Sequence, residues 1–163
     1  MKYWLLPAKE LINLKLALIK DEGRPYYCMG VLYENIGKNL IEINMYKKFL
    51  YICIMISDSN LFFDICELLA YDTIGIVYQK IGKRCPKYYN DAIEFHLKHR
   101  EIADIDEKFI AHNNLGQIYE KIGEKEKSAV NLQFALKYAI QMSSIAGQTI
   151  AVGNLVYLGS EYL

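Results

Sequence analysis

The chain has 163 residues, of which 53% are hydrophobic, and its 19 lysine and arginine residues balance 19 aspartate and glutamate residues. This length predicts one domain with a buried core, and the apolar fraction with only 3 prolines excludes a disordered or collagen-like chain. A net charge of zero argues against nucleic acid as the main partner, because proteins that bind the phosphate backbone carry a basic excess.

Amphipathic helices are predicted along much of the chain. The first is predicted over 8–20, and further helices are predicted over 40–56, 91–103 and 125–142. In each of them apolar residues recur with a period near 3.6, and charged residues stand between them. The basic and aromatic segment 83–90, before the helix at 91–103, is predicted to be a solvated loop.

One short pattern occurs four times along the chain. It reads M-G-V-L-Y from Met29, I-G-I-V-Y from Ile74, L-G-Q-I-Y from Leu115 and L-G-S-E-Y from Leu158. The glycines of successive copies are 45, 41 and 43 residues apart. Self-similarity at such a spacing is typical of arrays of helix pairs, so we predict that each copy lies in the first helix of a pair.

The glycines of this pattern predict two backbone roles. A glycine inside a helix costs about 1 kcal/mol relative to alanine, so its recurrence predicts the close approach of a second helix, where a Cβ atom would clash. This role is assigned to Gly30, Gly75, Gly116 and Gly159. Three further glycines follow the tyrosines by four residues, and we expect them in the left-handed conformation that ends a helix. They are Gly37, Gly82 and Gly123.

The apolar-Gly-x-x-Tyr pattern, with its second glycine and the small residues that follow, resembles the tetratricopeptide repeat. Ser128 and Ala135 take the small positions of the third repeat, and Ala92 does so in the second if about five residues are inserted in the turn. The segments 92–103 and 113–116 resemble most the longer repeats of spindle-orientation and cell-polarity adaptors. The chain departs from the family in lacking the usual tryptophan and closing proline, and in carrying Glu42 and Phe49 at small positions.

The resemblance implies an all-α fold, a right-handed α-solenoid of antiparallel helix pairs with about eight helices. It covers nearly the whole chain, so we expect a single tetratricopeptide-repeat-like domain over 1–163. Because a solenoid needs a cap over its last apolar face, we expect a fragment of a longer repeat protein or ends covered by another subunit. The segments are a leading half repeat at 8–20, full repeats at 24–56, 60–103 and 106–143, and the first helix of a fourth repeat at 147–163.

In this family the first helix of each pair lines a concave groove, and the resemblance carries that role to twelve residues. Their amides can donate and accept hydrogen bonds, which suits the main chain of a bound peptide or helix. Acids and amides stand where a carboxylate clamp would need bases, which argues against that mode of binding. The groove candidates are Tyr27, Glu34, Asp72, Thr73, Ile76, Gln79, Lys80, Asn113, Asn114, Gln117, Glu120 and Tyr157.

Histidines are the residues that raise the question of a metal. His96 and His99 share a helical face, and His112 lies on the next predicted helix, so the three could form a zinc site. We favour packing roles for them and expect no resident metal or cofactor. The chain also carries no dinucleotide-binding, phosphate-loop, nucleophile-elbow or metalloprotease motif, so we expect no enzyme.

The N-terminus and the cysteines favour a cytoplasmic protein. The apolar run from Tyr3 to Ala8 is too short for a signal peptide, and no apolar run approaches the length of a membrane span, so we expect no membrane insertion. We expect reduced thiols, because the cysteines show no pairing or metal-ligand spacing. They are Cys28, Cys53, Cys66 and Cys85.

Two hypotheses of function follow from these expectations. The first is a protein-interaction scaffold or adaptor whose concave groove binds a peptide or helix of a partner protein. The alternative is a structural subunit of a large cytoskeletal or ciliary assembly, held through its ends and convex face, which would add an association with the cytoskeleton.

Overall fold

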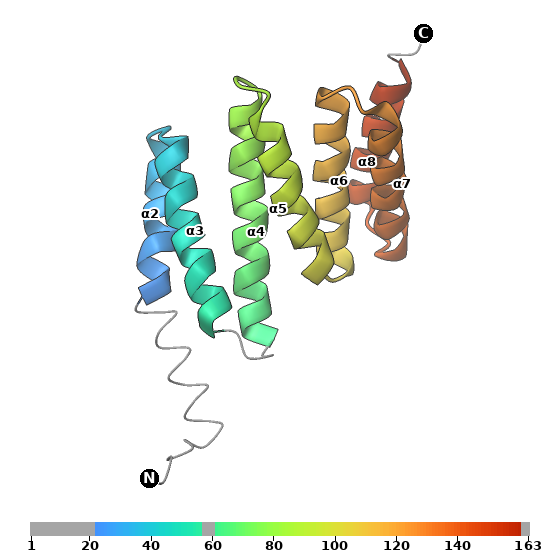
Figure 1. Cartoon of the computed structure of the whole chain (residues 1–163). Coiled ribbons are helices and arrows are strands. Elements are labelled where there is room, and N and C mark those ends of the chain that lie inside the picture. Colours follow the sequence, from blue (N-terminus) through green and yellow to red (C-terminus); the bar gives the residue numbers. More distant parts are fainter. Residues whose placement is uncertain (1–21, 57–60, 161–163) are drawn as a thin grey trace. The chain divides into compact units, whose positions relative to one another are not determined.

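The computed structural model describes residues 22–56 and 61–160, and within these ranges it is all-helical, with no strand (Figure 1). The all-α prediction is therefore confirmed for this part of the chain, with seven helices rather than about eight. The predicted helix over 8–20 lies outside the described residues. The helices are α2 (Arg24–Asn35), α3 (Asn39–Ile56), α4 (Leu61–Gly82), α5 (Tyr88–Ile102), α6 (Ile105–Lys121), α7 (Lys125–Gln141) and α8 (Ile145–Ser160).

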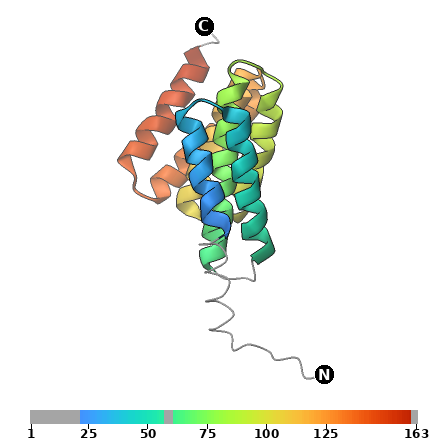
Figure 2. The ribbon, with the colours of Figure 1, turned by 90° about the vertical axis from the view of Figure 1, so that its left-hand side faces the viewer.

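The chain divides into two compact units between Ala70 and Tyr71, inside α4. In the first unit α2 and α3 lie side by side and run in opposite directions, as Figures 1 and 2 show. The ring centroid of Tyr27 on α2 lies 5.7 Å from that of Tyr46 and 5.4 Å from that of Phe49, both on α3. Aromatic contacts of this kind hold the pair together.

In the second unit α5 packs on α6, α6 packs on α7 and α7 packs on α8. The helical period explains the contact between α6 and α7. Ala111, Leu115 and Ile118 recur at intervals of four and three residues on α6 and are fully buried. Leu132 and Ala135 of α7 are buried as well, so the predicted small position at Ala135 lies in the core.

Three of the four repeat glycines lie where a second helix comes close. A Cβ atom on Gly30 would lie 2.5 Å from the ring of Tyr46, and on Gly116 it would lie 2.6 Å from Leu132. On Gly75 it would lie 2.7 Å from the ring of His96. The close neighbour is each time a large side chain of the second helix, so the predicted close approach is confirmed at these three glycines.

The fourth repeat glycine, Gly159 in α8, does not follow this rule. Among the described residues nothing lies within 4 Å of a Cβ atom built there. The predicted close approach is wrong at this position, because no second helix packs against it in the described part of the chain.

The turns confirm two of the three predicted helix ends. Gly37 and Gly123 have positive φ angles of 69° and 81°, in the left-handed region that glycine adopts freely. Gly82 is instead the last residue of α4, and a Cβ atom there would lie 2.6 Å from the ring of Tyr89. The prediction for Gly82 is wrong because the longer turn of this repeat lets the helix continue until Tyr89 packs against it.

The longer turn matches the predicted insertion. The residue of the second helix that contacts the repeat glycine comes 16 residues after Gly30 and 16 residues after Gly116, but 21 residues after Gly75. The predicted loop over 83–90 is shorter than expected, because α5 begins at Tyr88 and Tyr89 is buried.

No helix in the described ranges is long and apolar enough to cross a membrane.

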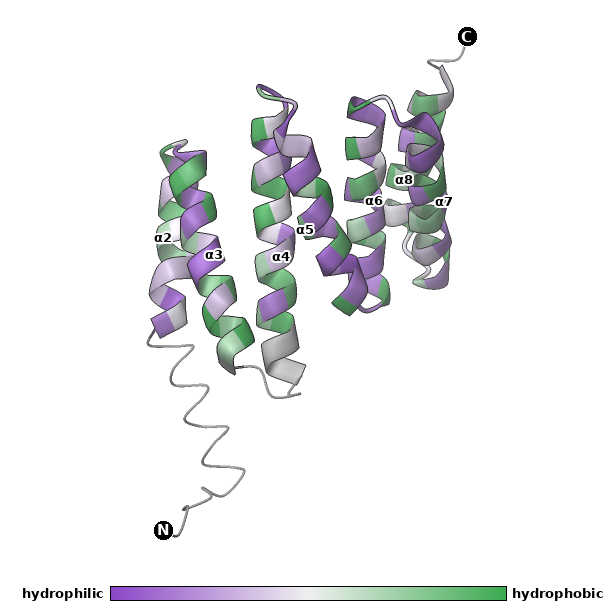
Figure 3. Ribbon diagram, in the orientation of Figure 1, coloured by the Kyte–Doolittle hydropathy of each residue, from purple (hydrophilic) through white to green (hydrophobic). Residues whose placement is uncertain are grey.

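The last helix exposes a series of large apolar side chains. Figure 3 shows hydrophobic residues along several turns of α8 and more hydrophilic residues on α5. Five large side chains of α8 are exposed, namely Ile145, Ile150, Val152, Val156 and Tyr157.

Candidate functional site

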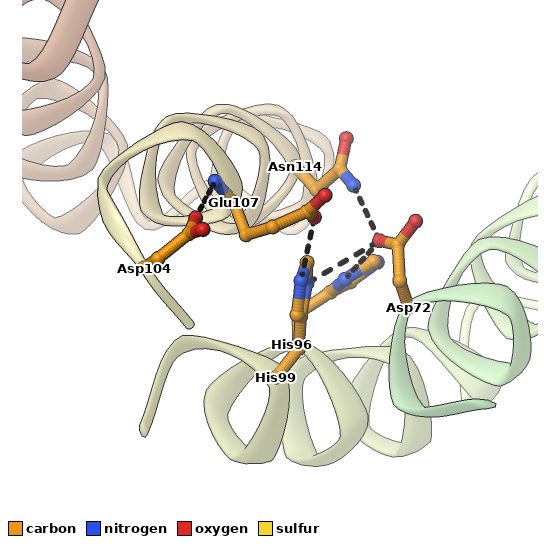
Figure 4. Close-up of polar contacts among 6 residues, drawn as sticks. All are labelled: Asp72, His96, His99, Asp104, Glu107 and Asn114. Carbon is orange, nitrogen blue, oxygen red and sulfur yellow. Dashed lines mark hydrogen bonds and ion pairs between the residues drawn. The ribbon is translucent and has the colours of Figure 1, made fainter. Parts of the chain in front are cut away.

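Three helices of the second unit bring polar side chains together below their surface (Figure 4). Asp72 comes from α4, and His96 and His99 come from α5, where their spacing of three residues places them on one face. Glu107 and Asn114 come from α6. We call Asp72, His96, His99, Glu107 and Asn114 the polar cluster.

The start of α6 places Glu107. Asp104 is the N-cap residue of this helix, and its Oδ1 accepts a hydrogen bond of 3.1 Å from the backbone N–H of Glu107. Such a cap satisfies a backbone donor that has no partner within the helix. It fixes Glu107 in the first turn of α6, from which its carboxylate reaches His99 of α5.

One carboxylate oxygen is the centre of the polar cluster. Oδ1 of Asp72 lies 3.4 Å from Nδ1 of His99 and 3.7 Å from Nδ1 of His96. Nδ2 of Asn114 donates a hydrogen bond of 3.4 Å to the same oxygen. On the far side of its ring, Nε2 of His99 lies 3.1 Å from Oε2 of Glu107, at hydrogen-bond distance.

Burial shifts the pKa of two members of the polar cluster, His96 and Asp72. The side chains of His96 and His99 are 0% exposed, and that of Asp72 is 19% exposed. Burial lowers the pKa of His96 to about 3, with His99 contributing, so His96 is neutral near pH 7. Burial also raises the pKa of Asp72, against the opposing effect of His99.

Two imidazoles of the polar cluster have unused hydrogen-bonding atoms. Among the described residues, neither ring nitrogen of His96 has a hydrogen-bond partner, nor does Nδ1 of His99. Buried polar atoms are nearly always paired, so these three nitrogens require an explanation.

His112 belongs to a separate network between α6 and α7. Its Nδ1 donates to Oδ1 of Asn131 over 2.9 Å, and Nδ2 of Asn131 donates to the backbone oxygen of Lys127 over 2.8 Å. The predicted small residue Ser128 donates to the backbone oxygen of Gly116 over 2.8 Å. The structure therefore separates His112 from the other two histidines and puts Asp72 beside them instead.

The spacing of Asp72 and Gly75 in the sequence indicates that Asp72 faces the second helix of its pair as well as the predicted groove. Asp72 precedes Gly75 by three residues, so both lie on one face of α4, and that glycine touches His96. Glu107 and Asn131 were not among the candidate residues. Asp104 and Glu107 have the spacing of a capping box, which predicts the start of a helix and places Glu107 in its first turn.

Two amide contacts show how the first helices of the second unit lie relative to one another. Asn114 on α6 bonds to Asp72 on α4, 42 residues earlier, and Nδ2 of Asn154 on α8 donates to Oδ1 of Asn113 on α6 over 2.8 Å, 41 residues earlier. The residues of α4 from Tyr71 onward, α6 and α8 are therefore neighbours in this order. We call them the first-helix layer.

Most of the predicted groove residues fall on this layer. Ile76, Lys80 and Tyr157 are exposed, whereas Asp72, Asn113 and Asn114 are partly buried and use polar atoms in contacts within the protein. Nζ of Lys121 lies 5.7 Å from the ring centroid of Tyr157. Thr73, Gln79, Gln117 and Glu120 are partly exposed on the layer, and Tyr27 and Glu34 lie on α2 in the first unit.

The four cysteines are free thiols. Cys53 on α3 is buried and shares a hydrogen bond with Cys66 on α4, both in the first unit. That contact raises the pKa of the Cys53 thiol, to which burial adds.

Comparison with known proteins adds no family to this description. No protein-family model matches the chain, and no curated protein is significantly similar to it.

Proposed function

We propose that the chain is a non-enzymatic adaptor of tetratricopeptide type, whose first-helix layer binds a peptide or helix of a partner protein. The observation that carries the proposal is the pair of amide contacts 42 and 41 residues apart, from Asp72 to Asn114 and from Asn113 to Asn154. Contacts that recur at the repeat spacing are expected when first helices stack side by side, as in an α-solenoid.

The chemistry of the first-helix layer suits such a partner. Ile76 and Tyr157 expose apolar area, and the partly exposed Gln117 offers an amide that can donate and accept. An amphipathic segment would bury apolar side chains on the first two residues while Gln117 bonds to its polar groups.

The charges on the layer do not favour a partner that presents a free carboxylate. Lys121 forms an ion pair of 3.0 Å with Glu120, and the side chain of Glu120 is mostly buried. A partner with apolar and uncharged polar side chains therefore fits better than an acidic tail.

Site-specific photocrosslinking tests the proposal in the cell. A photoreactive amino acid is placed at Ile76, Gln117 or Tyr157, and in control variants at Val130 or Ile140, which are exposed on the second helix α7. The proposal predicts that one and the same partner is captured from all three layer positions and from neither control position. Capture from α7 alone, or equally from both faces, contradicts it.

The alternative function, a structural subunit held through its ends and convex face, has one observation in its favour. Apart from Tyr157, α8 exposes four large apolar side chains, and α7 adds exposed Val130, Phe134 and Ile140. Exposed apolar patches of this kind commonly mark interaction surfaces. The crosslinking experiment separates the two functions, because this alternative predicts capture from the positions on α7. It also predicts that the chain associates with the cytoskeleton.

A further inference from the structure

We propose that Asp72, His96 and His99 form a binding site for a divalent transition-metal ion, zinc in particular. One ligand atom from each of these residues lies within 4.8 Å of the others. The site is independent of the proposed partner binding, because none of its three ligands needs to contact a partner.

The distances fit a tetrahedral ion. Zinc binds imidazole nitrogen and carboxylate oxygen at about 2.0–2.2 Å, which places two ligand atoms of a tetrahedron about 3.3–3.6 Å apart. Oδ1 of Asp72 lies 3.4 Å from Nδ1 of His99 and 3.7 Å from Nδ1 of His96. All three ligand atoms lie within 4.8 Å of one another, so an ion between them requires the two histidine side chains to move toward each other by no more than about 1–1.5 Å.

The tautomer of His99 is set by its other neighbour. The carboxylate of Glu107 accepts a hydrogen bond, so the proton of a neutral His99 ring lies on Nε2, and Nδ1 presents a lone pair. That lone pair faces the lone pairs of Asp72 Oδ1 across 3.4 Å. Two acceptors at this distance repel unless a proton or a metal ion lies between them, and a metal ion would also bind the unpaired His96.

The burial and the unpaired nitrogens of His96 provide a second, independent observation. Its side chain is 0% exposed, its Nδ1 points to the same oxygen of Asp72, and among the described residues its nitrogens make no hydrogen bond (Figure 4). A neutral buried imidazole supplies the lone pair that a metal needs without first losing a proton.

The residues around these three ligands resemble the surroundings of known metal sites in general. A metal-bound histidine usually donates its second ring N–H to a carboxylate, and bound carboxylates are themselves hydrogen-bonded. Glu107 takes the first role at His99, and Asn114 takes the second at Asp72. Two imidazoles and one carboxylate leave a fourth position for water.

The ligand types favour a transition-metal ion over magnesium or calcium. Imidazole and carboxylate groups suit zinc, whereas magnesium and calcium prefer oxygen ligands alone. Since Asp72 comes from α4 and the two histidines come from α5, the ion would join these two helices, and the contact of His99 with Glu107 would connect them to α6.

The test is a calorimetric titration of the full chain with zinc chloride, after removal of metal with a chelator. We expect one ion per chain and a rise in the melting temperature. Asp72→Asn should weaken binding at least about 100-fold, and Glu107→Gln about 10- to 100-fold, the range typical of residues that support a metal ligand. His112→Gln is the matched control, because this buried histidine bonds to Asn131 outside the cluster, and it should bind zinc as the wild type does.

Cysteines are the competing ligands, so a Cys53→Ala and Cys66→Ala double variant should retain the affinity. Cobalt(II) in place of zinc gives a second readout, with visible bands of tetrahedral nitrogen and oxygen coordination and no thiolate charge-transfer band. If Asp72→Asn does not fold, His99→Gln serves in its place. Absence of stoichiometric zinc in the wild type, unchanged affinity in the ligand variants, or loss of binding in the cysteine variant would each overturn the proposal.

Discussion

The contact of α4 with α5 and the contact of α6 with α7 share the same packing geometry but differ in whether their buried polar groups are paired. Each places a large side chain of the second helix on a repeat glycine, His96 on Gly75 and Leu132 on Gly116. Around Leu132 the polar atoms of Ser128 and His112 have hydrogen-bond partners. Around His96, ring nitrogens without a hydrogen-bond partner among the described residues face the carboxylate of Asp72.

The difference teaches that the repeat glycine fixes packing but not chemistry. A glycine accepts any large side chain that fills the space above it, whether apolar or polar. A structural contact gains stability by pairing or removing buried polar groups, and a contact that keeps them unpaired retains the capacity to bind a ligand.

Exchanging the two side chains should have the largest effect. Leu132→His buries an imidazole without a partner and removes apolar packing, so we expect a loss of about 3–5 kcal/mol in the free energy of unfolding. In chelator-treated protein, His96→Leu should instead be neutral or stabilise by about 1–3 kcal/mol, because it removes unpaired nitrogens. Urea denaturation measures both, and equal destabilisation by the two variants would show that His96 is a satisfied core residue.

The glycines provide the next comparison. Gly116→Ala places a Cβ atom 2.6 Å from Leu132, and overpacking of this kind costs about 1–3 kcal/mol. Gly153→Ala in α8 meets nothing within 4 Å among the described residues, so it should stabilise by about 0.5–1 kcal/mol through helix propensity. Thermal unfolding of both variants checks the contrast, and a stabilising Gly116→Ala would contradict the close approach.

The buried His112 predicts a pH dependence of stability. Burial lowers its folded pKa, as do the charges of Arg100 and Lys108, although the hydrogen bond to Asn131 opposes this. Above the unfolded value of about 6.5 the ring is neutral in both states, and as pH falls below that value the unfolded state binds the proton first. Stability therefore falls with decreasing pH, by at most about 1.4 kcal/mol per pH unit for this one proton.

His112→Gln should flatten that fall when urea unfolding is compared at pH 7 and pH 5. The quantity to compare is the slope rather than the absolute stability, since the variant also loses ring contacts with Phe134 and Tyr138. An unchanged slope would mean that His112 titrates normally in the folded protein.

The contact between Asn113 and Asn154 should give the smallest effect, about 0.5–1.5 kcal/mol for one neutral hydrogen bond. A double-mutant cycle of Asn113→Ala and Asn154→Ala isolates the pair. A coupling energy of about 0.5 kcal/mol or more supports α6 and α8 as neighbours in the first-helix layer, and additive effects would argue against it.

The helices, the helix pairs and the insertion in the second repeat could be predicted, because apolar periodicity and recurring glycines are local properties of the sequence. The left-handed ends at Gly37 and Gly123 followed from the same pattern, and the error at Gly82 arose because the inserted residues brought Tyr89 onto that glycine.

The polar cluster could be predicted only in part. The shared face of His96 and His99 is visible in the sequence, but which residue faces them depends on the rotation of α4 and α6 about their axes. The spacing of residues along the chain does not determine that rotation. The sequence therefore predicts Asp72 in the groove and groups His112 with His96 and His99.

The central claim is that Asp72, His96 and His99 converge on a cation. Anomalous diffraction at the zinc absorption edge, from crystals of chelator-treated protein reloaded with zinc, tests it most directly. We predict a single strong anomalous peak about 2.0–2.2 Å from Asp72 Oδ1 and from Nδ1 of both histidines. A peak at the cysteines, or no peak and two histidine rings turned to hydrogen-bond partners, would contradict the claim.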